Sequence, residues 1–407
     1  MKNNIIITLV LLSSFMAKSQ TPISLDEAYD KAIKNNLNLK NGQLKIDFQE
    51  KNKRSYAVVE PLSVSGEIGQ INSVYVDNAF SVSQTLRLPN FYKNQKKVLM
   101  EEWKNATLGL QFQKWQLKKE LQLLYNELVF MDEKATLLQK AENIYSQYYD
   151  RAKLRLNKGE SNILEKTTAE NLRAQAKIQL ANLQKDKEVV LHQFNFLIND
   201  EDFYTNKKTD GNFDFYQLQL SYNPQENINN ISLKPLEQQI IIEKTRVSAE
   251  KNKLLPSFTV GVTSGTQHGI GADDKFYNRS KRFQTATVGI GLPIFNSAQK
   301  SVIEAQKINE LIAENNYKLG VRNLENQSKK WFAEYEKLKQ ETDYYKAEGQ
   351  QNATTIINTA NRLYSEGEIN YLEWSILVNQ SLDLENRRID AQKLLNDKII
   401  ELNNLNQ

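Results

Sequence analysis

The chain has 407 residues, and its 53 basic and 49 acidic side chains leave a net charge of only +4, which argues against a surface built for nucleic acid. With no cysteine and only two histidines, the sequence lacks disulfides, thiolate metal sites and the common nucleophile and base pairs of enzymes. We therefore predict no catalytic residue, no metal ion and no cofactor.

The first predicted element is a cleaved export signal over residues 1–19. Lys2 precedes an apolar stretch from Ile5 to Leu12, and the small residues Ala17 and Ser19 suit signal peptidase. The apolar stretch is well short of the ~20 residues that span a bilayer, so a membrane anchor is the weaker interpretation. Without cysteine, we expect no lipid anchor on the exported chain.

A helix is predicted to open each half of the chain. In the first half, Ser24 and Glu27 have the spacing of a capping box at the start of a helix from Leu25 to about Tyr56. The segment from Leu233 to Leu255 is its counterpart in the second half.

After each opening helix the sequence changes to a period of two, which predicts two strands at 62–88 and two more at 256–293. Each strand has one apolar face and one face of small polar residues, as membrane barrels require. For any one strand taken alone, the edge of a soluble sandwich is the better explanation, because the barrel signal is weak in each segment. We predict that the apolar face meets lipid. The candidate lipid-facing residues are Val82, Leu86, Val260, Val288 and Ile290.

Four strands per chain cannot close a transmembrane barrel, which needs about eight or more. An open sheet edge in lipid would leave backbone groups without hydrogen-bond partners. We therefore expect several copies of the chain to share one barrel.

Long helices are predicted to follow the strands. Apolar residues recur every seven positions from Trp103 to Ala152, and again from Tyr317 to Tyr345, which is the pattern of a coiled-coil seam. Helices over 92–158 and 297–366 would each be roughly 100 Å long at 1.5 Å per residue. Each is predicted to end at a glycine and return as a second helix, giving antiparallel hairpins over 92–199 and 297–405.

Two motifs recur in the same order, which indicates an internal duplication. Leu88-Pro89-Asn90-Phe91 returns 204 residues later as Leu292-Pro293-Ile294-Phe295. Gly159 to Glu165 returns 208 residues later as Gly367 to Glu373, with five of seven positions identical. We predict a first repeat over 20–230, which ends in a connection at 200–230, and a second over 231–407.

Six short segments together carry a resemblance to a known family. They are Ser24-Leu25-Asp26-Glu27-Ala28, Asn35-Asn36, Leu254-Leu255-Pro256-Ser257-Phe258, Gly291-Leu292-Pro293-Ile294-Phe295, Gly159-Glu160 and Gly367-Glu368. In these segments and their order the sequence resembles the outer-membrane efflux protein (TolC-like) family over essentially its whole exported length. Leu37 departs from the pattern, because the family often has proline after its paired asparagines.

The resemblance implies a mainly α-helical homotrimer in which twelve strands form a shared outer-membrane β-barrel above a periplasmic α-barrel. It also implies a passive export duct of a tripartite efflux or type I secretion system. The partners would be outer-membrane lipid, a periplasmic adaptor (membrane fusion) protein and an inner-membrane pump of the RND or ABC type. The adaptor-docking tips would be Gly159, Glu160, Gly367 and Glu368.

Two other interpretations compete with the channel. An enzyme lacks support, because Gly289 and Gly291 lie in a strand before proline rather than in a phosphate loop. We expect a structural role for His192 among apolar helical residues and a solvated loop position for His268. A secreted periplasmic coiled-coil scaffold without channel activity explains the heptads. It does not explain why paired alternating strands interrupt them in both halves.

Overall fold

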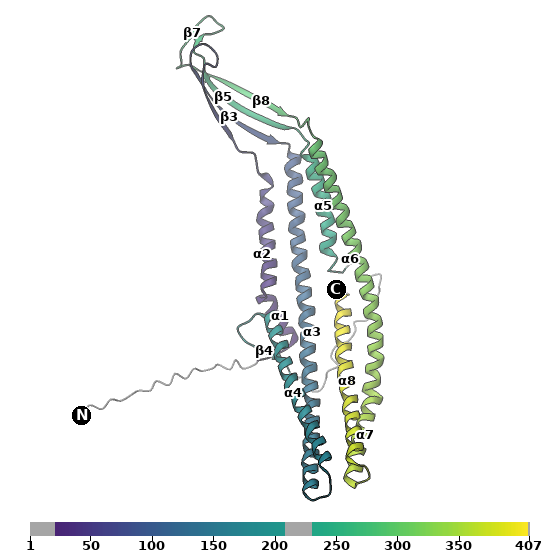
Figure 1. The fold of residues 1–407 in the computed structure, drawn as a ribbon. Helices are drawn as coiled ribbons and strands as arrows, with labels where there is room; N and C mark the ends of the chain where they lie inside the picture. The colour runs from purple at the N-terminus through teal and green to yellow at the C-terminus, as the bar shows by residue number, and fades with distance from the viewer. Residues whose placement is uncertain (1–20, 208–229, 406–407) are drawn as a thin grey trace, which may run out of the picture. The chain divides into compact units, whose positions relative to one another are not determined.

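The computed structural model describes residues 21–207 and 230–405 and is mainly α-helical (Figure 1). The predicted export signal lies outside these residues, as does 208–229 of the predicted connection. None of the described helices combines the length and apolarity that crossing a bilayer requires.

The α-helices are α1 (Leu25–Asn35), α2 (Leu37–Asn52), α3 (Pro89–Asn157), α4 (Ile163–Ile198), α5 (Lys234–Asn252), α6 (Ser297–Tyr344), α7 (Gln350–Glu366) and α8 (Tyr371–Leu405). The strands are β1 (Thr21–Ile23), β2 (Ser63–Gly69), β3 (Asp77–Arg87), β4 (Tyr204–Asn206), β5 (Ser257–Thr266), β6 (Gly269–Ile270), β7 (Phe276–Tyr277) and β8 (Arg282–Gly291).

The chain divides into two compact units, and both draw on each predicted repeat. The helical unit comprises the described residues of Met1–Leu39, Lys114–Glu226 and Asn326–Gln407. The strand unit comprises the described residues of Lys40–Gln113 and Asn227–Glu325. The predicted repeats at 20–230 and 231–407 are therefore not two separate compact bodies.

A four-stranded antiparallel sheet in the order β2-β3-β5-β8 is the centre of the strand unit. The central pair joins the two predicted repeats, because β3 from the first pairs with β5 from the second, with Val82 opposite Val262. Residues that face one another across antiparallel strands lie on the same side of the sheet. The register therefore places even-numbered strand residues on one face and odd-numbered ones on the other.

The helical unit is built around residues 114–157 of α3, and the apolar heptad positions of this part are largely buried, as predicted. Leu121 and Leu128 are completely buried, and α8 supplies Val378 and Ile400 to the same core. Polar contacts between α3 and α8 accompany this packing: the Asn126 amide donates to the Asp397 carboxylate at 2.7 Å. Other contacts of this kind join Lys134 to Asp390, Lys140 to Glu385 and Tyr145 to Asn379.

The predicted opening helix from Leu25 to about Tyr56 is wrong as one helix, because the chain breaks at Asn36. There ψ is 125°, and the Asn36 side chain accepts hydrogen bonds from the backbone of Asn38 and Leu39. Its amide also donates to the Leu197 carbonyl at 2.9 Å. An asparagine side chain that satisfies backbone groups in this way competes with helix continuation, so α1 ends and α2 begins.

The helix predicted over 297–366 also departs from uniform α geometry. A π-helical turn at Tyr345–Gly349 separates α6 from α7, whereas α3 runs without interruption. Gly349 is buried, and a Cβ there would lie 3.1 Å from the Tyr345 ring. A π-helical turn contains one residue more than an α-helical turn. Here the wider turn ends at Gly349, whose lack of a side chain lets the Tyr345 ring pack against the backbone.

Candidate functional site

The two predicted tips are turns of the same geometry in the helical unit, and both lie at the same end of it (Figure 1). Gly159 and Gly367 have φ of +74° and +79°, a conformation that glycine adopts without steric cost. The next residue of each turn donates its backbone N–H to a carbonyl five positions back, Glu160 to Arg155 and Glu368 to Leu363, both at 2.9 Å. These are Schellman motifs, so the glycines end the two helices by backbone bonds alone.

The returning helices also begin alike. Asn162 caps α4 by accepting from the Glu165 backbone at 3.1 Å, and Asn370 caps α8 by accepting from the Glu373 backbone at 3.0 Å. The two glutamates, Glu165 and Glu373, differ in their burial. The Glu373 carboxylate accepts from the Asn370 backbone at 3.0 Å and remains exposed, whereas Glu165 is only 3 % exposed.

Glu165 connects the two hairpins, a role that sequence reasoning missed. Its carboxylate accepts from the Tyr364 hydroxyl at 2.8 Å and lies 3.1 Å from the Arg155 guanidinium, and Ser161 also donates to it. Beside this contact the rings of Tyr148 and Trp374 pack with centroids 4.4 Å apart. A buried carboxylate requires such partners, so the ends of α3, α4, α7 and α8 are held as one cluster.

We expect Tyr364→Phe to loosen the hairpins near their tips, because it removes a hydrogen bond to a buried charge. Such bonds contribute about 1.5–3 kcal/mol. Burial raises the pKa of Tyr364 to about 12, so its stabilising contribution is complete below pH 10 and is lost as the pH rises through about 12.

Hydrogen exchange of the tip amides checks this expectation. Tyr149→Phe is the matched control, because the Tyr149 ring faces Arg173 at 5.5 Å and its hydroxyl has no hydrogen-bond partner within the described residues. Equal exchange rates in both variants would show that the Glu165 contact does not hold the hairpins together.

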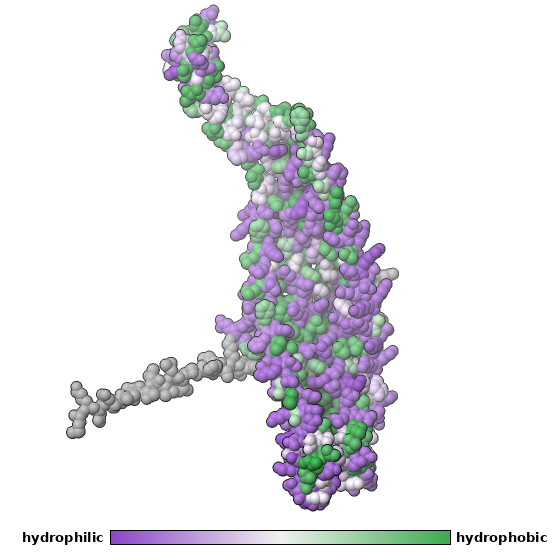
Figure 2. All heavy atoms as spheres, in the orientation of Figure 1, coloured by the Kyte–Doolittle hydropathy of each residue, from purple (hydrophilic) through white to green (hydrophobic). Residues whose placement is uncertain are grey.

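The surface around the tips is partly apolar. Glu160 and Glu368 are both exposed, as predicted, and hydrophobic side chains gather at this end in Figure 2. A cleft of about 920 Å³ is lined by Gly367 and Glu368 together with Arg155 and Glu165, while Gly159 and Glu160 lie outside it. The exposed apolar side chains near the turns are Leu154, Ile163, Leu164 and Leu372, between 54 % and 63 % exposed.

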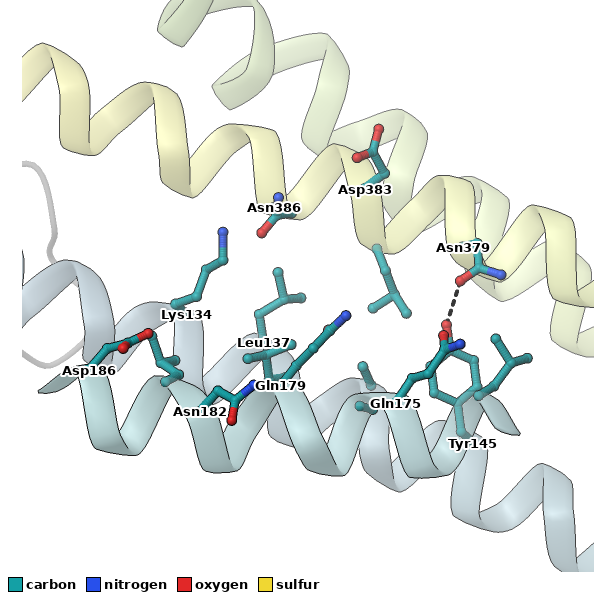
Figure 3. A pocket seen from close by; sticks show the side chains of 16 residues that line it. Lys134, Leu137, Tyr145, Gln175, Gln179, Asn182, Asp186, Asn379, Asp383 and Asn386 are labelled. Carbon is teal, nitrogen blue, oxygen red and sulfur yellow. Dashed lines mark hydrogen bonds between the residues drawn. The ribbon is translucent and has the colours of Figure 1, made fainter. Parts of the chain in front are cut away.

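A second cavity, of about 540 Å³, lies among α3, α4 and α8 (Figure 3). Amide side chains of Gln175, Gln179 and Asn182 project into it from α4 (Figure 3). Tyr145 donates to Asn379 at 2.7 Å at one end of the cavity. Among residues 21–207 and 230–405, no group of three His, Asp or Glu side chains could hold a metal ion.

All five predicted lipid-facing residues lie on the same face of the four-stranded sheet. Val260 is directly opposite Val288, and Leu86, Phe258 and Ile290 form a row across three strands. Val288 and Ile290 are 76 % and 63 % exposed, so this apolar face is not buried against another part of the chain. The same face also carries Val64 and Val262, which are 68 % and 56 % exposed.

The opposite face of the sheet is polar, and its hydroxyl side chains pair with one another across neighbouring strands. The hydroxyls of Ser81 and Thr263 lie 2.8 Å apart, and those of Thr85 and Thr259 lie 3.0 Å apart. The sheet therefore has one apolar face and one face of small hydroxyl residues.

Both histidines have environments that differ from the predicted ones. The ring of His268, predicted to be solvated, stacks on the Tyr75 ring with centroids 4.5 Å apart, and its backbone N–H donates to buried Asp77 at 2.7 Å. His192, predicted to have a structural role, is instead exposed on α4 and contacts the Phe203 ring.

Comparison with known proteins relates this fold to outer-membrane channels. No protein-family model matches the chain, and no curated protein sequence matches it. A membrane protein from Pseudomonas aeruginosa has a similar structure, with a TM-score of 0.79, 15% identity, and coverage of 94% of this chain and 93% of that one. The MtrE outer membrane channel of Neisseria gonorrhoeae, in its open state, has a TM-score of 0.75 at 15% identity, covering 94% and 88% of the two chains.

The CmeC outer membrane channel of Campylobacter jejuni gives a TM-score of 0.72 at 16% identity, covering 93% of this chain and 85% of that one. All three alignments include the strand unit and the helical unit, because they cover nearly the whole described chain. The protein therefore has the TolC-like fold of outer-membrane channels.

Proposed function

We propose that the protein is the outer-membrane channel subunit of a tripartite efflux or type I secretion system and acts as a passive export duct. In this proposal the sheets of three copies form one barrel in the outer membrane. The helical hairpins continue the duct into the periplasm. Transport energy comes from an inner-membrane pump, because the chain itself carries no nucleotide motif.

The observation that carries the proposal is the exposed apolar face of the sheet. A protein that stayed in water would leave Val64, Val260, Val288 and Ile290 as one contiguous apolar surface of a kind that soluble monomers rarely expose. In a bilayer the same surface meets acyl chains, while the hydroxyl face lines water. The two faces thus suit a barrel wall better than a scaffold.

The tips support the proposed adaptor contact. A periplasmic adaptor needs an exposed, repeated surface, and each chain offers two Gly-Glu turns flanked by exposed leucines and isoleucine. Three copies would present six such turns. The apolar side chains would supply contact area, and the glutamates would be available for ion pairs or hydrogen bonds.

Fractionation of expressing cells tests the channel against the periplasmic scaffold. We expect the protein to sediment with outer membranes, to need detergent for extraction, and to migrate as an oligomer that heating dissociates. Release in the soluble periplasmic fraction without detergent would favour the scaffold and contradict the channel.

A further inference from the structure

Two strand edges in the sheet are without a partner, and this inference rests on the proposed shared barrel. Within the described strands, β2 and β8 each pair on one side only. Both edges are exposed along nearly their whole length. Neither contains proline or lysine, the residues that commonly protect an edge from pairing with another chain.

The internal duplication makes β8 equivalent to β3. The Leu-Pro-x-Phe motif follows both strands directly, at Leu88 and at Leu292, which sets an offset of 204 residues. The hairpin registers then make β5 equivalent to β2: Ser83 is opposite Ser63, and its equivalent Thr287 is opposite Gly261. Gly261 therefore corresponds to Ser63, and each β5 residue corresponds to the β2 residue 198 positions earlier.

The pairing between the repeats within one chain supplies the template for a second seam. Val82 is opposite Val262 and Ser81 is opposite Thr263 in the β3–β5 pair. Replacing each of these residues by its equivalent places Ala286 of β8 opposite Val64 of β2, and Thr285 opposite Ser65. These strands are the two outer edges of one sheet, so the seam can form only between two copies of the chain.

We propose that β8 of one copy pairs antiparallel with β2 of a second copy in this register, with Ala286 opposite Val64 and Thr285 opposite Ser65. The side chains agree with the template. Ala286 and Val64 continue the apolar face, and the hydroxyls of Thr285 and Ser65 repeat the pair that Ser81 and Thr263 form at 2.8 Å. A shift by one residue would place apolar side chains on the hydroxyl face.

Cysteine cross-linking tests the register, and the chain has no cysteine of its own to interfere. Residues directly opposite one another have Cα atoms roughly 4.5–5.5 Å apart, within the range of a disulfide. Co-expressed chains that carry Ser65→Cys alone and Thr285→Cys alone should form covalent dimers after oxidation in the membrane. Such a disulfide must lie between copies, because the cysteines are on different chains.

Ser65→Cys co-expressed with Thr287→Cys is the shifted control, since a two-residue shift on one face separates Cα atoms by roughly 7–8 Å. We expect at least tenfold less dimer from this pair. Ser81→Cys with Thr263→Cys in one chain should close a disulfide without covalent dimers and shows that oxidation is efficient on this face.

The outcomes separate the seam from the proposed function. More dimer from the shifted pair, or none from either pair while the oligomer remains in the outer membrane, would overturn the register and leave the channel intact. A protein that is monomeric and released without detergent would overturn both.

Discussion

Placing arginine at Val288 and Ile290 together should abolish assembly of the protein in the outer membrane. Both side chains lie on the exposed apolar face of β8, and both are next to apolar partners, Val260 and Phe258. A charge on the lipid face of a barrel costs roughly 2–4 kcal/mol near the membrane midplane. The summed cost of two such charges in each copy of a shared barrel is comparable to or larger than the free energy of unfolding of a typical folded protein.

Thr287→Arg is the matched control for the double variant. It places the same side chain on the same strand, but on the hydroxyl face, where Thr287 is opposite Gly261. We expect the control to assemble and the double variant not to, as measured by the heat-sensitive oligomer in outer-membrane fractions. Equal oligomer yields would contradict the assignment of Val288 and Ile290 to lipid.

The features that the sequence predicted well depend on local periodicity. Alternation fixes which strand residues share a face, and the register places all five candidate residues together. A seven-residue repeat fixes the buried seam of α3, and glycine marks each tip because few other residues accept φ near +75°.

Features that depend on distant partners were not predictable in this way. Glu165 and Glu373 occupy the same position of the same motif, yet only Glu165 is buried, because Tyr364 reaches it from the other hairpin. Asn36 breaks the opening helix since its amide meets the carbonyl of Leu197, which lies 161 residues later. No pattern within either segment distinguishes these roles.

Reversing the charge at both tips should prevent coupling to the adaptor without unfolding the protein. The Schellman turns use backbone groups, and the carboxylates of Glu160 and Glu368 make no hydrogen bond within the described residues. Glu160→Lys with Glu368→Lys should therefore leave the cap intact. Single Glu→Ala changes should be mild, since exposed ion pairs contribute about 0–1 kcal/mol each.

The double reversal should be severe because every copy in the assembly repeats it and repulsion would replace any attraction at each tip. Cross-linking of the adaptor to the channel, and export by cells, measure the effect in variants that still form oligomers in the outer membrane. Glu188→Lys with Glu336→Lys makes the same change in net charge on exposed residues of α4 and α6, so it controls for charge alone. We expect near-normal export from this control and at least a tenfold loss from the tip variant. Full export and unchanged cross-linking in the tip variant would instead leave Glu160 and Glu368 as ordinary residues of helix-ending turns.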